Sequence, residues 1–134
     1  MPAKLVETAC WPAPNKPGKM LMYFEHLKKE GVDLDAFWAY STAMGESRMA
    51  AVGKNPAKLR AALKKAGVDF ETSRCFLLTG TDKAGALIDA TQALAKAGVN
   101  IEAADAVAAA GRFAATIFVR ENELNKAKKA LKAR

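Results

Sequence analysis

The sequence predicts an α+β fold made of two βαββαβ units in tandem, with antiparallel sheets that carry their helices on one face. The first observation is a repeated phrase: NKPGKMLMYFEHLKKEGVDL at 15–34 returns in altered form as TDKAGALIDATQALAKAGVNI at 81–101. Each copy contains a turn, a helical pattern, a glycine stop and the start of a strand. Two pairs of equivalent glycines lie 67 residues apart, Gly18 with Gly85 and Gly31 with Gly98. This constant offset indicates an internal duplication.

Length and composition agree with a duplicated globular chain. The 134 residues divide into a first unit at 1–70 and a second unit at 71–134, each close to the smallest size that holds a core alone. We therefore expect the units to share a sheet, a helical layer or a dimer interface. Hydrophobic residues make up 51% of the chain and charged residues 26%, so disorder is not indicated.

The first unit reads as βαββαβ. We expect a proline-rich segment from Cys10 to Gly18 to end the first strand, because proline cannot donate to a strand ladder. Gly31 follows two lysines and is typical of a helix end, while Asn55 and Pro56 are typical of a helix start. The expected strands lie at 3–9, 32–40, 48–53 and from 68, and the expected helices lie at about 18–30 and after Pro56.

The second unit reads as βαββα, one strand short, because the sequence stops at Arg134 where the first unit would begin its last strand. In the ferredoxin-like strand order 4-1-3-2, this loss leaves the apolar strand at 75–79 as an exposed edge, which favours pairing with another chain or with the first unit. The expected elements are a strand at about 69–79, a helix with Leu87, Ile88, Thr91 and Leu94 inward, a strand with Val99, Ile101, Ala103, Asp105 and Val107 on one face, a strand with Phe113, Ala115, Ile117 and Val119 on one face, and a helix from about 122 with Leu124, Ala127 and Leu131 inward.

The turn of the form D/N-K-x-G, the helix after it and the A-G-V-N-I that opens the next strand closely resemble the ACT domain, best in TDKAGALIDATQALAKAGVNIEAADA at 81–106. Taken as a whole, the chain is similar to stand-alone tandem ACT proteins that have no attached catalytic domain. The resemblance implies a ferredoxin-like fold, the binding of a free amino acid and a regulatory role without catalysis. The first unit departs from the family at Lys19-Met20, and Ala84 stands where a proline is frequent.

The strand-to-helix turns are the candidate ligand sites. A helix start leaves backbone N–H groups unpaired and favours negative charge, and a glycine without Cβ lets a carboxylate approach them. Oxygens of Asn15 and Asp82 offer acceptors for an α-ammonium group, so one turn can hold both ends of an amino acid. The candidate ligand-binding residues are Asn15, Lys16, Pro17, Gly18, Lys19 and Met20 in the first turn, Asp82, Lys83, Ala84, Gly85, Ala86 and Leu87 in the second, and Asn100 and Ile101 on the following strand.

Structural alternatives stay open for several of these residues. Asn15 and Asp82 are also good helix caps, and capping is an alternative task for both. Lys16 and Lys83 also fit a solvated surface. Asn100 is equally consistent with a polar residue at a strand edge. A partner-binding ACT module that has lost its ligand is therefore the second hypothesis.

The net charge of +7 raises the alternative of RNA binding, since RNA-recognition modules share the βαββαβ plan. The charge concentrates on the second helix of each unit, where it fits a solvated helix face. Phe113 and Phe118 resemble the aromatic residues of an RNA-binding strand, but they fall on opposite faces, whereas base stacking requires one face. Nucleic acid is therefore an unlikely partner, and a homodimer is the expected assembly.

Other chemistries have little support in the sequence. His26 is the single histidine, and we expect it at the surface or at the boundary of the core. Cys10 and Cys75 match no metal spacing, so we expect two reduced, packed thiols and neither a metal nor a cofactor. No phosphate-binding or dinucleotide-binding glycine motif occurs. No apolar run is long enough to cross a membrane and no secretion signal is evident, which predicts a cytoplasmic protein.

Overall fold

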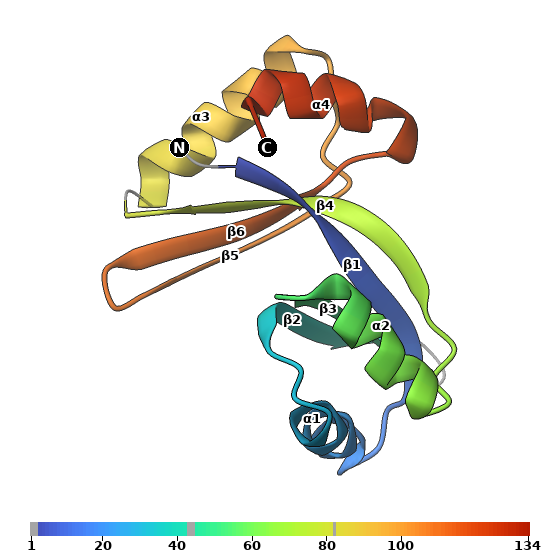
Figure 1. The fold of residues 1–134 in the computed structure, drawn as a ribbon. Coiled ribbons are helices and arrows are strands. Elements are labelled where there is room, and N and C mark those ends of the chain that lie inside the picture. Colours follow the sequence, from blue (N-terminus) through green and yellow to red (C-terminus); the bar gives the residue numbers. More distant parts are fainter. Residues whose placement is uncertain (1–2, 43–44, 82) are drawn as a thin grey trace. The chain divides into compact units, whose positions relative to one another are not determined.

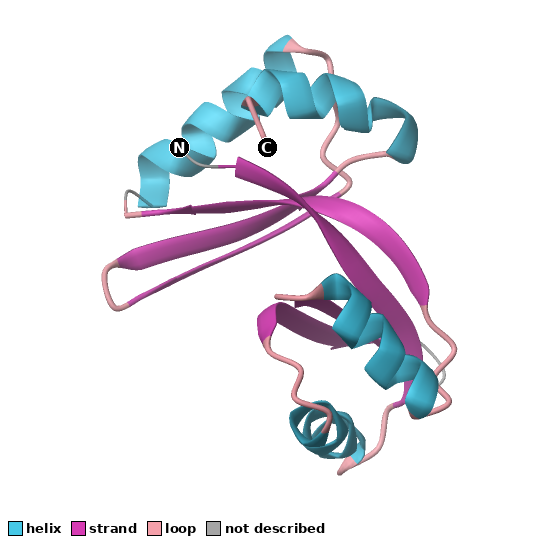
Figure 2. Cartoon of the chain, viewed as in Figure 1, coloured by secondary structure: helices cyan, strands magenta, loops and turns pink. Residues whose placement is uncertain are grey.

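The computed structural model describes residues 3–42, 45–81 and 83–134. Six strands form one sheet in the order β2-β3-β1-β4-β6-β5, which confirms the α+β class and the expected shared sheet (Figure 1). Short turns and loops join the helices and strands (Figure 2). The elements are β1 (Ala3–Pro14), α1 (Lys19–Lys29), β2 (Leu34–Ser41), β3 (Glu46–Gly53), α2 (Pro56–Lys65), β4 (Glu71–Gly80), α3 (Lys83–Lys96), β5 (Ala103–Ala109), β6 (Arg112–Phe118), the short 3-10 helix η1 (Glu121–Glu123) and α4 (Leu124–Leu131).

The chain forms two compact units whose limits differ from the predicted halves 1–70 and 71–134. One unit contains residues 7–73, and the other combines residues 1–6 with residues 74–134. Strand β1 therefore serves both units, and the second unit obtains from the start of the chain the fourth strand that its own half lacks.

The segment 3–6 is integrated into the second unit by packing and by hydrogen bonds. Ala3 is buried in the core of that unit, and Leu5 packs against the same cluster. The backbone N–H of Leu5 donates to the carbonyl of Arg134 at 2.9 Å, and the N–H of Arg134 donates to the carbonyl of Ala3 at 3.1 Å. Strand β4 consequently lies between β1 and β6. The strand at 75–79 is therefore paired, and of the two predicted alternatives the structure shows pairing with the strand that begins the chain.

The core of unit 7–73 lies between its strands and its two helices. Trp11 on β1 is fully buried, and its ring meets the ring of Tyr23 on α1 edge-on at 5.7 Å and the ring of Phe37 on β2 at 6.5 Å. Leu59 and Leu63 on α2 complete this cluster. The helices of the unit thus share one face of its strands, as the sequence predicts.

Strand β1 extends five residues beyond the predicted end at 9 and passes through Pro12 and Pro14. The N–H of Asn15 donates to the carbonyl of Gly45 at 2.8 Å, on the side of β3. Since N–H groups alternate between the two edges of a strand, the missing N–H groups of Pro12 and Pro14 both face away from β3. The β1/β3 ladder therefore continues, and the predicted break at Cys10 is wrong.

The second unit packs α3 and α4 on one side of its strands (Figure 1). Ala86, Ala90 and Leu94 form the buried stripe of α3, whereas Ile88 is 54% exposed and Thr91 is exposed. The predicted inward positions of Ile88 and Thr91 are wrong, because the stripe follows positions four apart that are filled largely by alanine. The hydroxyl of Thr91 instead donates to carbonyls of the preceding helical turn.

The strands of the second unit differ strongly in burial. Phe113, Ala115 and Ile117 on β6 are buried on one face, as predicted. Every residue of β5 is exposed, including Val107 at 66%. Strand β5 lies at the end of the sheet order, so its predicted apolar face covers no core.

Candidate functional site

The first candidate turn, residues 15–20, is exposed and leads directly into α1. Gly18 precedes the helix with φ of 87° and ψ of −12°, a left-handed conformation that glycine adopts without a steric penalty. A Cβ added at Gly18 would have no heavy atom within 4 Å. Glycine is thus required here by the backbone conformation, and the space in front of it is open.

The start of α1 has no side-chain cap. The N–H of Lys19 donates to the carbonyl of Lys16 at 3.3 Å, and the carbonyl of Gly18 accepts from Met22. Among the residues that the structure describes, no side chain accepts a hydrogen bond from the N–H groups of Met20 and Leu21. These two donors are available to an anion.

Asn15 does not cap α1, because Gly18 occupies the cap position three residues later. The Asn15 side chain is exposed and makes no hydrogen bond within the described part of the chain, while its backbone N–H pairs with Gly45. The capping alternative for Asn15 is therefore wrong. Lys16, Pro17 and Met20 are also exposed, whereas Lys19 is half-buried.

The second candidate turn is described only in part. Asp82 lies outside the described residues, and α3 begins at Lys83 and continues through Ala84 and Gly85. Ala86 and Leu87, which we expected at the ligand, pack against the core of the second unit instead. Their side chains hold α3 on the sheet.

Asn100 and Ile101 lie outside any strand, in the connection between α3 and β5. The amide of Asn100 donates to the carboxylate of Glu102 at 3.0 Å, and this carboxylate also accepts from Arg120 at 3.1 Å. Ile101 is half-buried against the core. Asn100 therefore belongs to an exposed polar cluster on its own unit.

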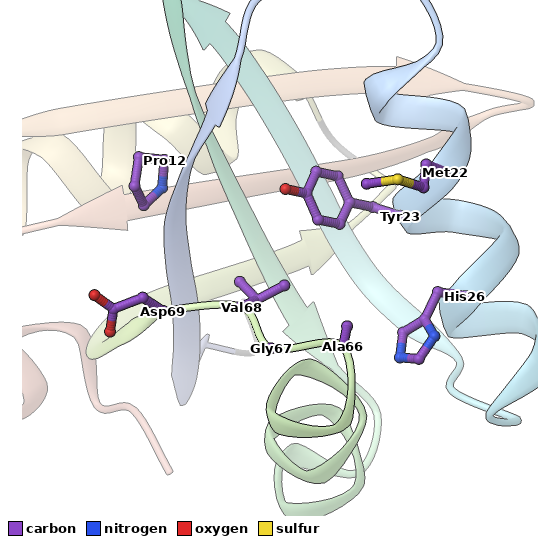
Figure 3. A pocket seen from close by; sticks show the side chains of 8 residues that line it. All are labelled: Pro12, Met22, Tyr23, His26, Ala66, Gly67, Val68 and Asp69. Atoms are coloured by element: carbon purple, nitrogen blue, oxygen red, sulfur yellow. The ribbon is translucent and has the colours of Figure 1, made fainter.

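A further pocket lies within unit 7–73 and contains none of the predicted site residues (Figure 3). It is open to solvent, and its volume is about 480 Å³. Segments far apart in the sequence form its walls, which is why sequence patterns missed it. The lining residues are Pro12 on β1, Met22, Tyr23 and His26 on α1, and Ala66, Gly67, Val68 and Asp69 after α2.

His26 joins the two helices beside this pocket. The imidazole is half-buried, and its Nε2 lies 2.7 Å from the carbonyl oxygen of Ala62 on α2. A carbonyl only accepts, so Nε2 carries the proton and donates. The predicted place of His26 at the boundary of the core is confirmed.

The two thiols differ in environment. Cys75 is fully buried, and Cys10 is half-buried on β1. Burial raises the pKa of the Cys10 thiol above its ordinary value, against the opposing effects of the Arg48 charge and a hydrogen bond with Ser73. A raised pKa keeps the Cys10 thiol protonated and weakly nucleophilic at neutral pH.

No group of three or more His, Cys, Asp and Glu side chains among residues 3–42, 45–81 and 83–134 has an arrangement that could hold a metal ion. In the same ranges, no helix is long and apolar enough to cross a bilayer.

No protein-family model matches the chain, and no curated protein matches it. Solved structures do. A protein from Bacteroides thetaiotaomicron is 22% identical, with a TM-score of 0.83 over 97% of this chain and 88% of that chain. The regulatory subunit of aspartate kinase from Thermus flavus is 18% identical, with a TM-score of 0.61 over 98% and 95%.

The regulatory subunit of aspartate kinase from Thermus thermophilus, in its ligand-free form, is 17% identical with a TM-score of 0.62, again over 98% of this chain and 95% of that chain. These likenesses concern the arrangement of strands and helices. The chain therefore has the fold of the ACT-type regulatory domains of aspartate kinase.

Proposed function

We propose that the protein is a non-catalytic regulatory module of the cytoplasm that binds a free amino acid or a similar small carboxylate. The ligand carboxylate lies at the start of α1, against the N–H groups of Met20 and Leu21, and its ammonium group lies near Asn15. The equivalent turn at 82–87 is the second proposed site. Binding changes the association of the protein with itself or with an enzyme.

The open start of α1 is the observation that carries this proposal. An uncapped helix start with an exposed asparagine beside it offers donors to a carboxylate and an acceptor to an ammonium group. Similarity in fold to regulatory subunits of aspartate kinase adds support for a regulatory role.

Thermal unfolding in the presence of each common amino acid at millimolar concentration tests the proposal. We expect at least one to raise the melting temperature, because a ligand at a hundred times its Kd stabilises the folded state by about 2.7 kcal/mol. Asn15→Ala should remove most of that shift. Asn125→Ala, at an exposed position of α4, is the matched control and should keep it. A flat response to the whole panel contradicts the proposal.

A partner-binding module without a small ligand is the second candidate, and the surface of α1 favours it. Four large apolar side chains on this helix are exposed: Met20 at 42%, Leu21 at 60%, Met22 at 46% and Phe24 at 38%. If a second copy covers these side chains, Leu21→Ser will lower self-association in sedimentation experiments. Unchanged self-association would contradict this candidate.

A further inference from the structure

The pocket of Figure 3 owes its existence to the sequence of β1. Pro12 presents no N–H on the edge of β1 that faces away from β3, so segment 66–69 cannot form a ladder with β1 at that residue. Strand β4 begins only at Glu71. The gap between Pro12 and this segment is bounded on its remaining side by α1, and it forms the pocket.

Two side chains of the lining, His26 and Asp69, can accept hydrogen bonds. His26 donates its Nε2–H to Ala62, so in the neutral ring the other nitrogen, Nδ1, is an acceptor. Asp69 contributes a carboxylate, and within the described part of the chain it has neither an ion pair nor a hydrogen bond. Figure 3 shows His26 and Asp69 at opposite ends of the lining.

The electrostatic potential around the pocket also favours a cation. The pocket lies at the C-terminal end of α2, where the helix dipole is negative. Two lysines of the last helical turn, Lys64 and Lys65, do not line the pocket, and Lys65 pairs with Glu30 at 3.2 Å. An anionic ligand would therefore meet Asp69 and the helix end without a lysine in the lining to offset them.

The remaining lining is apolar and shaped by the core. Pro12, Met22 and Val68 contribute aliphatic surface. Tyr23 contributes a ring whose orientation is fixed by its edge contact with the fully buried Trp11. In Figure 3 this ring extends from α1 with its hydroxyl end directed away from the helix. A flat apolar body of modest size fits such a lining.

We propose that this pocket binds a small organic ammonium ion with an apolar body, at a site separate from the turn at 15–20. The ammonium group pairs with Asp69, and the apolar part lies against Pro12, Met22 and the ring of Tyr23. An aromatic ring on the ligand adds an edge or stacking contact with Tyr23.

The second unit provides an internal comparison. At the offset of the repeat, Met22, Tyr23 and His26 correspond to Asp89, Ala90 and Ala93. These three residues also line a pocket of their own unit, but that pocket has a volume of only about 160 Å³ and has Lys132 in its lining. It offers no aromatic ring, and Lys132 opposes a cation. The ring of Tyr23 and a lining without lysine therefore distinguish the pocket of unit 7–73 from this one.

Titration of the ¹⁵N-labelled full chain with benzylamine, followed by NMR, tests the proposal. Benzylamine should produce saturable shifts at the amides of Gly67, Val68 and Asp69, whereas benzoate and benzyl alcohol, of matched shape, should bind at least several-fold more weakly. Asp69→Asn should weaken benzylamine about two- to fivefold, as expected for an exposed ion pair. Ala66→Phe, which fills the mouth of the pocket, should abolish binding. Asp89→Asn in the second unit is the matched control and should have no effect.

Three outcomes would overturn the proposal. The first is benzoate binding as tightly as benzylamine at these amides, and the second is an unchanged affinity in Asp69→Asn together with Ala66→Phe. The third is the lack of saturable shifts at 67–69 in a well-folded spectrum. Asn15→Ala separates the two proposals, because it should remove the response to the amino-acid panel and leave benzylamine binding at 67–69 unchanged.

Discussion

Gly18 and Asn15 have different roles in the turn that precedes α1. Gly18 takes the left-handed backbone conformation that starts α1. The side chain of Asn15 therefore does not cap α1, and it remains exposed. Asparagine is usually a strong helix cap, so a side chain that is free of this task has room for a ligand. Asn55 takes the opposite role, because it caps α2 in the expected way.

Cys10 gives the protein a pH dependence at the alkaline end. The pKa of its thiol is raised in the folded state, so the folded chain holds this proton at a pH where the unfolded chain has lost it. The contribution of Cys10 is therefore complete below about pH 8.5, the usual pKa of an unfolded thiol, and is lost as the pH rises above that value. Urea unfolding at pH 7 and pH 10 measures this loss.

The comparison variant for that measurement is Cys10→Ala, in which the alkaline loss should be smaller than in the natural chain. The two proteins differ only at residue 10, so the difference in slope belongs to Cys10. Equal slopes in the two proteins would show that the environment of Cys10 has no effect on stability.

At the scale of the element, the start of α2 is the best-defined signal in the sequence. The side-chain oxygen of Asn55 accepts from the N–H of Lys58 at 3.2 Å, and Pro56 occupies the first helical position. Asn55→Ala should lower the free energy of unfolding by about 1 kcal/mol. Asn125→Ala, on the exposed surface of α4, should change it by less than about 0.5 kcal/mol. Chemical denaturation of both variants measures these changes. Equal free energies of unfolding for the two variants would exclude the Asn55 cap as a stabilising contact.

Helix boundaries were predictable from sequence because their determinants are local. Gly31, Gly67 and Gly98 each follow a helix and have φ between 70° and 72°, where glycine is strongly favoured. The full length of β1 was not predictable in the same way. The effect of Pro12 depends on which edge of the strand its missing N–H faces, and that edge is set by pairing with a strand more than thirty residues away.

Tertiary packing also decided two features that the sequence concealed. Hydrophobicity favours Ile88 as a core residue of α3, yet the buried stripe contains the alanines Ala86 and Ala90. The pocket is formed by β1, α1 and the segment after α2, so no single stretch of sequence predicts it. Only the unusual Pro12 in a paired strand marks its place. The first turn was predictable because one contiguous stretch contains all its parts.

At the scale of the whole molecule, the repeat and the compact unit have different limits. Each half of the sequence contains one copy of the repeated phrase. The compact units have other limits, because residues 1–6 of the first half belong to the unit formed by residues 74–134. Unit 7–73 is continuous in sequence and contains α1, β2, β3, α2, most of β1 and the start of β4, whereas unit 74–134 depends on residues 1–6 for its fourth strand.

Fragments make this asymmetry measurable. Residues 7–73 alone should unfold cooperatively on heating, because the core around Trp11 is contained in them. Residues 74–134 alone should lose cooperative unfolding, because the edge of β4 and the core next to Ala3 become exposed. Joining residues 1–6 after Arg134 through a short linker should restore it. Circular dichroism records all three melts, and a cooperative melt of 74–134 without this segment contradicts the argument.

The exposed strand β5 has a consequence for behaviour at high concentration. Six of its seven residues are alanine or valine, and Asp105 is its single charge. An unprotected sheet margin of this composition is a template on which strands of other molecules can assemble. Purified stocks should therefore be prone to form ordered aggregates through this strand at high concentration, and Asp105 is the one carboxylate of β5 that opposes the stacking of neighbouring molecules there.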